Sequence, residues 1–318
     1  MKKSLRIFWI SAVSLCCYLL ACNSPQKALQ TDDPIFRLVS SDKSGLHFAN
    51  QVLENDTLNY YTFPYLFMGG GVALGDINQD GLSDIFITGN MVPNRLYLNK
   101  GNLQFEDISE SAGIMGDDRW YTGVSMLDIN QDGWLDIYVC VSGKYGPFEN
   151  QLYINNRDQT FSEGASKYGL NDNSTSIQAT SFDYNQDGLL DLFVANYPQL
   201  PVSMGNAFYA QKMQQNRPKD SGHLYQNMGN GRFEDVTTKA GLQNFGLTLG
   251  VVASDLNQDG WTDLYLSNDF NVPDYLYLNN GDGTFSERLP RQLAILQCLG
   301  WGWMRQISIM MVFPIWGR

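Results

Sequence analysis

The chain of 318 residues is poor in the side chains that most enzymes use for acid–base and nucleophilic chemistry. It contains only two histidines, His47 and His223. It has no Gly-x-Ser-x-Gly elbow, no His-Glu-x-x-His pair and no glycine-rich phosphate loop. These absences disfavour hydrolases, zinc peptidases and nucleotide-dependent enzymes.

Cysteine is also scarce, with five residues in the whole chain. Two of them, Cys16 and Cys17, lie in a short apolar run at the N-terminus, and Cys22 comes two residues after the end of that run. Cys140 lies in a predicted strand and Cys298 near the C-terminus. Cysteines distributed in this way provide no disulfide framework.

Positive charge is the third shortage, since 21 basic residues face 33 acidic ones and the net charge is −12. A net-negative chain gives no support for nucleic-acid binding. Twelve of the acidic residues belong to one repeated motif, so the remainder of the chain carries as many acidic as basic residues. The acidity is therefore concentrated in that motif.

The N-terminus has the pattern of an export signal. Lys2, Lys3 and Arg6 form a basic start, and the apolar run over 7–20 is too short to span a bilayer comfortably. This pattern predicts a signal peptide over residues 1–21.

The end of this run, Leu19-Leu20-Ala21-Cys22, resembles a bacterial lipobox. That resemblance implies cleavage before Cys22, whose thiol takes a diacylglycerol. Residues 22–35 are then the lipidated cysteine and a polar tether. We expect an exported protein, lipid-anchored in the bacterial cell envelope at the outer membrane or cell surface. The alternative is an ordinary cleaved signal peptide.

The chain is rich in one acidic motif, which occurs four times, at 76–84, 128–136, 183–191 and 255–263. Each copy has side-chain oxygens at positions 1, 3, 5 and 9, glycine at position 6, and a main-chain carbonyl to offer at position 7. Calcium takes six to eight oxygen ligands, and glycine permits the sharp turn that brings them together. The predicted calcium ligands, about one ion per loop, are Asp76, Asn78, Asp80, Leu82, Asp84, Asp128, Asn130, Asp132, Trp134, Asp136, Asp183, Asn185, Asp187, Leu189, Asp191, Asp255, Asn257, Asp259, Trp261 and Asp263.

A single copy of this motif is also explained as a solvated turn, because Asp, Asn and Gly are ordinary turn formers. Four copies with the same oxygen positions favour a metal site. The loops are not EF-hands, because position 12 is apolar in every copy (Ile87, Val139, Val194 and Leu266). The β-branched and aromatic residues that follow each loop predict strands, which places the loops in β-hairpins.

The motif recurs within a longer repeat. Its first Asp residues are 52, 55 and 72 positions apart, and each loop is followed by a Leu-Tyr-x-Asn sequence and then by a Phe eight residues after the Tyr. Four short strands in about 50 residues are the size of one β-propeller blade. We therefore predict an all-β fold, a propeller of four-stranded blades over 36–287, with blades at about 68–115, 120–172, 177–243 and 248–287.

Two segments depart from the regular repeat. Residues 36–46 carry a Phe and a Gly-Leu pair at nearly the blade spacing, which predicts an orphan last strand that would close an incomplete ring. Residues 198–222 are an insertion with a short predicted helix over 206–215. This insertion is either a binding loop or a surface excursion without function.

These residues resemble the FG-GAP/VCBS-type calcium-binding propeller repeats, and in particular bacterial surface lipoproteins that carry several of them. Segments 70–76 and 274–285 are typical of that group. The Phe-Gly and Gly-Ala-Pro signatures of integrin-type repeats are not evident, so integrin function is not expected. The resemblance implies a propeller, calcium in the loops, and a non-catalytic binding or scaffold role with a protein or glycan ligand.

Residues 288–318 lack the repeat landmarks. Reading across codon junctions, Met310–Met311 forces Asp and Met311–Val312 forces Gly, and the neighbouring junctions permit Asp-Ile-Asn-Asn-Asp-Gly-Phe-Pro-Asp. A fifth metal loop would then begin near position 307. We therefore expect that a frameshift between about 288 and 300 has truncated a longer protein.

Two alternatives to the binding module stay open. One is a propeller hydrolase or other enzyme of the cell envelope. The other is a structural fragment of a larger multi-domain surface protein whose recognition site lies elsewhere.

Overall fold

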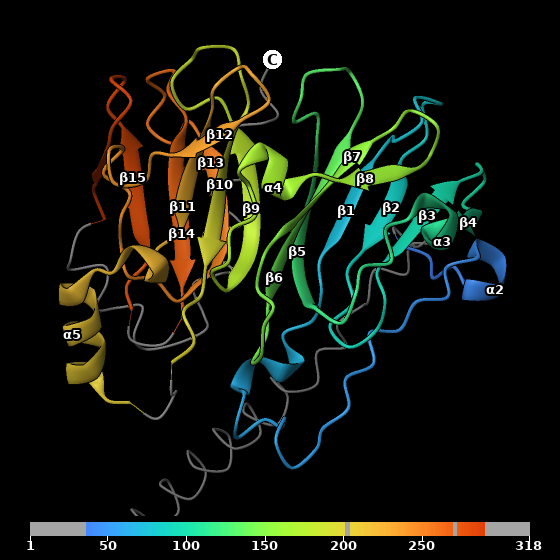
Figure 1. The fold of residues 1–318 in the computed structure, drawn as a ribbon, viewed down its shortest axis with the longest axis horizontal. Helices are drawn as coiled ribbons and strands as arrows, with labels where there is room; N and C mark the ends of the chain where they lie inside the picture. Colours follow the sequence, from blue (N-terminus) through green and yellow to red (C-terminus); the bar gives the residue numbers. More distant parts are fainter. Residues whose placement is uncertain (1–35, 201–203, 270–271, 290–318) are drawn as a thin grey trace, which may run out of the picture. The chain divides into compact units, whose positions relative to one another are not determined.

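The computed structural model describes residues 36–200, 204–269 and 272–289 (Figure 1). The predicted signal peptide, Cys22, the tether and nearly all of the predicted out-of-frame tail lie outside these residues. No helix in the described ranges has both the length and the apolar character needed to cross a membrane. The chain divides into two units, 1–40 and 41–318, and all described helices and strands belong to the second.

The described strands form four sheets, each with four antiparallel strands in chain order (Figure 1). We name these sheets blades 1 to 4. Blade 1 contains β1 (Val72–Gly75), β2 (Asp84–Ile87), β3 (Arg95–Asn99) and β4 (Phe105–Asp107); blade 2 contains β5 (Trp120–Leu127), β6 (Asp136–Ser142), β7 (Gln151–Asn155) and β8 (Phe161–Glu163). Blade 3 contains β9 (Ser176–Phe182), β10 (Asp191–Asn196), β11 (His223–Asn227) and β12 (Phe233–Asp235); blade 4 contains β13 (Thr248–Ser254), β14 (Asp263–Asn268), β15 (Tyr275–Asn279) and β16 (Phe285–Glu287).

The prediction of an all-β fold built from four-stranded propeller blades is confirmed. In the described part of the chain the four blades do not close a ring. The second strands of blades 2 and 3 show why β-branched and aromatic residues follow each acidic motif. Every residue of β6 and of β10 is buried, because each of these strands has a neighbouring blade on both faces.

Neighbouring blades approach most closely at their first strands. The hydroxyl of Thr122 in β5 donates a 2.7 Å hydrogen bond to the carbonyl of Ser176 in β9. One residue further, a Cβ atom on Gly123 would lie 2.3 Å from the carbonyl oxygen of Ile177. Glycine is therefore required at this position because the backbone of the next blade occupies the space of a side chain.

Three layers of the hydrophobic core each lie between two consecutive blades. Phe86 and Leu96 of blade 1 pack with Val139 of blade 2. Leu192 of blade 3 packs with Cys140 of blade 2, and the third layer joins blades 3 and 4. The aromatic residues of the repeat landmarks, such as Tyr153 and Phe161, lie in these layers, as predicted for inter-blade core residues.

A short helical turn follows the last strand of blades 1 and 2, namely α3 (Ser109–Ala112) and α4 (Ala165–Tyr168). Each ends at a glycine with positive φ, Gly113 and Gly169. The Phe-to-Gly spacing of the repeat therefore marks a strand and then a helical turn with a left-handed glycine cap.

Residues 36–46 form only the second half of this pattern. They contain α2 (Ser41–Ser44) and Gly45 with a φ of 77°, while 36–40 carry no strand. The predicted orphan strand at 36–46 is therefore wrong. A strand needs a hydrogen-bonding neighbour, and no described strand pairs with 36–40.

Two segments cover the end of the blades opposite the four acidic loops, at the lower edge of Figure 1. One is the stretch before blade 1, which includes the 3₁₀ helix η1 (Pro64–Phe67). The other is the insertion in blade 3, which contains α5 (Asn206–Gln215) and η2 (Pro218–Asp220), so the predicted helix is confirmed. Tyr209 of α5 is 2% exposed and packs with Tyr197 and Phe245, which fixes the insertion on the blades.

Candidate metal centres

The four acidic motifs are the connections between the first and second strands of the four blades, and we name them loops 1 to 4. Because each occupies the same connection, all four lie at one end of the blades, the upper end in Figure 1. This placement confirms the prediction that the loops sit in β-hairpins.

Loop 1 wraps around the carboxylate of its first residue. Asp76 accepts hydrogen bonds from the main-chain N–H groups of Asp80 (3.1 Å) and Gly81 (2.7 Å). Asp80 in turn accepts the N–H of Leu82 at 2.8 Å and the side-chain amide of Asn78 at 3.0 Å. The side chains at positions 1, 3 and 5 are thereby turned toward the inside of the loop.

The other three loops repeat this geometry. The first Asp accepts the N–H of the position 6 glycine at 2.8 Å in loop 2 and at 2.9 Å in loops 3 and 4. These glycines have φ values of 86°, 87° and 89°, a conformation that L side chains rarely adopt. The structure therefore explains why glycine stands at position 6 in every copy.

The carboxylate at position 9 is buried at the start of the second strand. Asp84, Asp136, Asp191 and Asp263 are each 0% exposed. Each accepts the N–H at position 2 of its own loop through one oxygen, and through the other the N–H of the Asn that ends the third strand. The position 9 side chain thus links the loop to two strands of its blade.

That terminal Asn is a structural residue whose role the sequence pattern did not reveal. Asn99 donates its side-chain amide to the carbonyl of Ser83 at 2.8 Å, and Asn155, Asn227 and Asn279 make the equivalent bond in the other blades. The fixed Leu-Tyr-x-Asn spacing after each loop was the signal available in the sequence.

The loops concentrate negative charge that the described residues largely leave uncompensated. Burial, together with the charges of Asp132 and Asp128, raises the pKa of Asp136 to about 7, and burial acts in the same way on Asp191 in loop 3. The exception is Asp132. Burial acts to raise its pKa, but the hydrogen bond and charge of Arg157, 3.0 Å away, outweigh burial and lower it.

The donor chemistry of each loop suits a hard cation, with three carboxylates, an amide oxygen and the position 7 main-chain carbonyl within nine residues. In the described ranges, however, no three Asp, Glu, His or Cys side chains are gathered closely enough to hold a metal ion by themselves. A cation in these loops would therefore need the position 3 amide oxygen and the position 7 carbonyl in addition to the carboxylates.

The glutamine at position 4 is a second feature of the loops that the sequence reasoning missed. Gln79, Gln131, Gln186 and Gln258 all adopt positive φ, between 57° and 63°. Three of them donate their side-chain amide to the carbonyl of the position 6 glycine in the next loop. The repetition of Gln in all four copies was the signal in the sequence.

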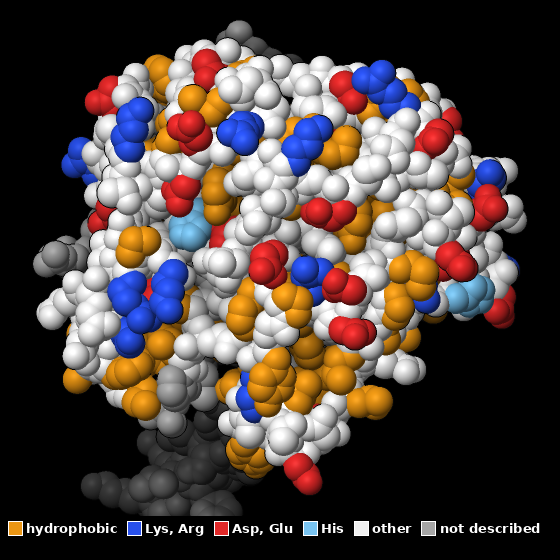
Figure 2. Space-filling view, in the orientation of Figure 1, with side chains coloured by type: hydrophobic (Ala, Val, Ile, Leu, Met, Phe, Trp, Pro, Cys, Tyr) orange, Lys and Arg blue, Asp and Glu red, His pale blue; other side chains and the backbone are white. Residues whose placement is uncertain are grey.

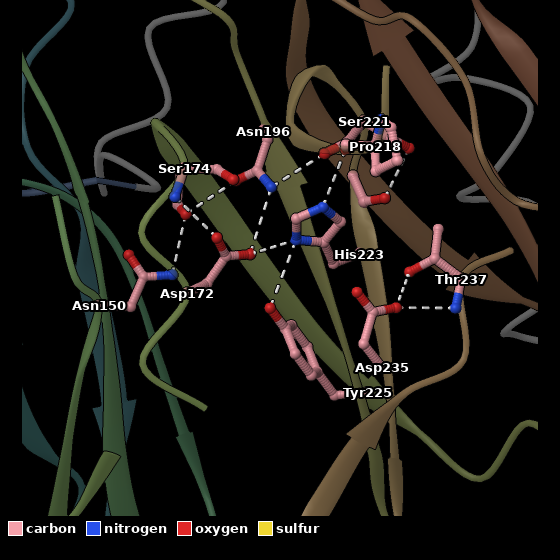
Figure 3. A network of polar contacts seen from close by, with 12 residues as sticks. Asn150, Asp172, Ser174, Asn196, Pro218, Ser221, His223, Tyr225, Asp235 and Thr237 are labelled. Carbon is pink, nitrogen blue, oxygen red and sulfur yellow. Dashed lines mark hydrogen bonds and ion pairs between the residues drawn. The ribbon is translucent and has the colours of Figure 1, made fainter. Parts of the chain in front are cut away.

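His223, which an enzyme hypothesis would examine first, belongs to a buried polar network between blades 2 and 3 (Figure 3). Its Nδ1 lies 2.7 Å from a carboxylate oxygen of Asp172, and its Nε2 lies 3.1 Å from the carbonyl of Pro218. Asn196 donates to the same Asp172 oxygen at 3.3 Å. Both ring nitrogens are engaged, so this histidine has none left to move a substrate proton.

The electrostatics of this pair are those of a structural ion pair. Burial acts to lower the pKa of His223, but the hydrogen bond and charge of Asp172 raise it to about 9. Burial acts to raise the pKa of Asp172, but the hydrogen bond and charge of His223 lower it to about 2. The pair holds η2 of the insertion against β11.

The repeats and their hairpin loops place this chain in a known family. A family model described as FG-GAP-like repeat matches residues 76–139, 140–194, 209–266 and 255–308. These matches cover more than half of the chain, so the protein belongs to the family of FG-GAP-like repeat proteins. The resemblance stated from the sequence is confirmed at this level.

Distant relatives carry the same repeats. The chain is 28% identical to cartilage acidic protein 1 of Mus musculus over 221 residues, and 27% identical to the human protein over the same length. These alignments cover 69% of this chain and 31% of each relative, so the chain spans about a third of their length. It is also 29% identical to integrin alpha-3 of Cricetulus griseus over 187 residues, 52% of this chain and 16% of that protein. The similarity to an integrin was not expected from the sequence, because the Phe-Gly and Gly-Ala-Pro signatures of integrin-type repeats are not evident in it.

Proposed function

We propose that this chain is a calcium-binding, non-catalytic propeller module that serves binding or scaffolding at the bacterial cell envelope. The observation that carries the proposal is the loop geometry. Four loops place three carboxylates, an amide and a free carbonyl at the same positions of four hairpins, at one end of the blades.

Calcium in these loops is structural in this proposal. Each loop links the first and second strands of a blade, and the position 9 carboxylate also binds the third strand. A bound dication would neutralise the carboxylates that otherwise repel one another. We expect dissociation constants on the order of 10⁻⁴ to 10⁻³ M, as in other extracellular calcium modules.

Thermal melting with and without calcium tests the proposal. A ligand that binds only the folded state at ten times its dissociation constant adds about 1.4 kcal/mol per site. We expect a clear rise of Tm in 10 mM calcium over a chelator, and a smaller rise in magnesium, which demands a stricter octahedral geometry. An unchanged Tm in calcium would refute structural calcium.

The envelope location in the proposal depends on residues 1–22. Cys22 is the proposed lipidation site, and the polar residues 23–35 are the tether between lipid and propeller. Mass spectrometry of the mature N-terminal peptide tests this, and we expect a diacylglyceryl-modified Cys22. The Cys22→Ala variant should lose both the lipid and the association with the membrane. A mature N-terminus without lipid would leave an ordinary secreted protein.

The proposed ligand surface lies at the end of the blades opposite the metal loops. A groove of about 360 Å³ there is lined by Leu58, Met91, Trp120, Lys144 and Tyr145, among others. Figure 2 shows hydrophobic side chains gathered over this lower part of the molecule. Exposed aromatic residues beside charged ones suit a protein or glycan partner. A glycan array and Tyr145→Ala test this surface: retained binding by the variant would exclude it.

A further inference from the structure

The position 4 glutamines have an unusual backbone conformation. A non-glycine residue in the left-handed region costs roughly 1–2 kcal/mol, and Asn tolerates it better than Gln because its shorter polar side chain bonds locally. Nevertheless Gln occupies this position in all four loops, with φ between 57° and 63°. The side chain must therefore supply something that offsets the strain.

The bonds of these side chains connect separate blades. Gln79 of loop 1 donates to the carbonyl of Gly133 in loop 2 at 2.7 Å. Gln131 of loop 2 donates to Gly188 of loop 3 at 2.9 Å, and Gln186 of loop 3 donates to Gly260 of loop 4 at 2.8 Å. An unbroken series of side-chain bridges thus runs from the first loop to the fourth.

Each bridge holds a peptide group beside the candidate ligands. In loop 2, Gln79 holds the carbonyl of Gly133, while the N–H of the same peptide, on Trp134, donates to Asp132 at 2.9 Å. The next carbonyl along the chain, that of Trp134, is the candidate ligand at position 7. Holding the preceding peptide plane from both sides restricts the position of Trp134, and therefore the directions that its carbonyl can take.

The two ends of the series differ from its middle. Gln258 of loop 4 makes no hydrogen bond to any residue of the described ranges through its side-chain amide, although its backbone has the same conformation. Within the same ranges, no glutamine holds the carbonyl of Gly81 in loop 1. The chain therefore contains its own control for the bridge.

We propose that the position 4 glutamines couple the four loops, so that a cation in one loop pre-orders the ligands of the next. Each glutamine is a positioning residue: it does not touch the cation but holds the following loop in its ligand geometry. By thermodynamic linkage the coupling acts in both directions between two bridged loops. This inference rests on the proposed calcium function and adds to it the mechanism by which the loops act together.

Terbium, which binds calcium-type oxygen ligands and emits when a nearby tryptophan is excited, gives a readout for a single loop. Position 7 is a tryptophan only in loops 2 and 4, as Trp134 and Trp261. In a Trp261→Phe background the sensitised emission reports loop 2. The bridge to loop 2 comes from Gln79, and the matched control is Gln258.

The decisive substitution is Gln79→Asn, since Asn accepts the left-handed backbone but is one methylene too short to bridge. We expect its terbium midpoint for loop 2 to rise about two- to tenfold, the factor that one net hydrogen bond provides. Gln258→Asn should leave the midpoint unchanged. Melting in chelator checks that both variants are equally folded.

Three other results would overturn the inference. A Gln79→Asn midpoint equal to that of Gln258→Asn, with emission retained, overturns the coupling alone. Tighter terbium binding in Gln79→Asn would show that position 4 affects the loop only through its left-handed backbone conformation, and not through the bridge. If the parent protein shows no sensitised terbium emission that decreases on addition of calcium, the calcium function itself is overturned, and the coupling with it.

Discussion

The side-chain amide of Asn155 donates a 2.9 Å hydrogen bond to the carbonyl of Ile77, which lies 78 residues earlier in loop 1. The same amide donates to Leu135 of its own blade at 3.1 Å, and the Asn155 N–H donates to Asp136 at 2.8 Å. One side chain thus joins two consecutive loops. Asn279 repeats the relationship between blades 4 and 3, with a 2.8 Å bond to Tyr184.

Replacing Asn155 by Ala should therefore destabilise the protein more than the loss of an exposed polar side chain does. Asn155 is 3% exposed, and its loss leaves buried carbonyl groups without their donor. We expect a loss of about 1–3 kcal/mol in the free energy of unfolding, measured by urea denaturation. The neighbouring Asn156 bonds to Thr160 and Ser162 in an exposed turn, so Asn156→Ala should stay within about 0.5 kcal/mol. Equal losses in the two variants would contradict the bridging role.

Gly123→Ala tests the close approach of blades 2 and 3. The added methyl group would meet the backbone of Ile177, which cannot move aside as a side chain can. We expect a loss of about 1–3 kcal/mol, as in other overpacked cores. Gly250 holds the same position in blade 4 and meets only the side chain of Gln178 at 3.7 Å. Gly250→Ala should therefore be nearly neutral, and a costly Gly250→Ala would indicate a backbone requirement unrelated to blade packing.

The His223–Asp172 pair predicts how stability depends on pH. The pKa of His223 is raised from 6.5 to about 9, so its contribution is fully present below pH 6.5 and is lost as the pH rises toward 9. The pKa of Asp172 is lowered from 3.8 to about 2, so its contribution is present above pH 3.8 and is lost as the pH falls toward 2. The pair therefore stabilises the fold most between about pH 4 and 6.5.

Urea denaturation between pH 6.5 and 9 measures this effect. The parent protein should lose stability over this range, and His223→Gln should lose less because it has no proton to release. At pH 6, Asp172→Asn should cost about 3–5 kcal/mol, because it breaks a buried, hydrogen-bonded ion pair. An identical pH profile in the parent and in His223→Gln would show that other groups control this range.

Asp187→Asn separates calcium binding from folding. Asp187 is the exposed position 5 residue of loop 3 and accepts the N–H of Leu189 at 2.9 Å, a bond that an Asn oxygen can replace. In chelator the variant should match the parent within about 0.5 kcal/mol, since one repelling charge is removed and no core contact is lost. In calcium its Tm should rise less than that of the parent. An equal rise in both proteins would exclude loop 3 as a calcium site.

The repeat made most of the architecture predictable from the sequence. Its landmarks located the blades and the hairpin loops, because strand length, turn glycines and aromatic core positions recur at fixed spacing. The prediction of a strand at 36–46 was wrong although the Phe and Gly of this segment match the repeat landmarks. A strand forms only when a neighbouring strand pairs with it. Local spacing does not carry that information.

The inter-blade bonds could not be predicted for a related reason. Gln79 and Gly133 are 54 residues apart, and only the packing of consecutive blades brings them together. The sequence shows that Gln recurs but not what it reaches. The same holds for Asn155 and Ile77, and for the pairing of His223 with Asp172 across blades 2 and 3.

The proposed calcium in the four loops can be located by anomalous X-ray scattering from crystals grown in calcium, which shows bound ions without reference to stability. We predict four anomalous difference peaks, one in each loop, surrounded by the side chains at positions 1, 3, 5 and 9 and the carbonyl at position 7. Well-ordered loops without such peaks, in crystals containing 10 mM calcium, would contradict the claim.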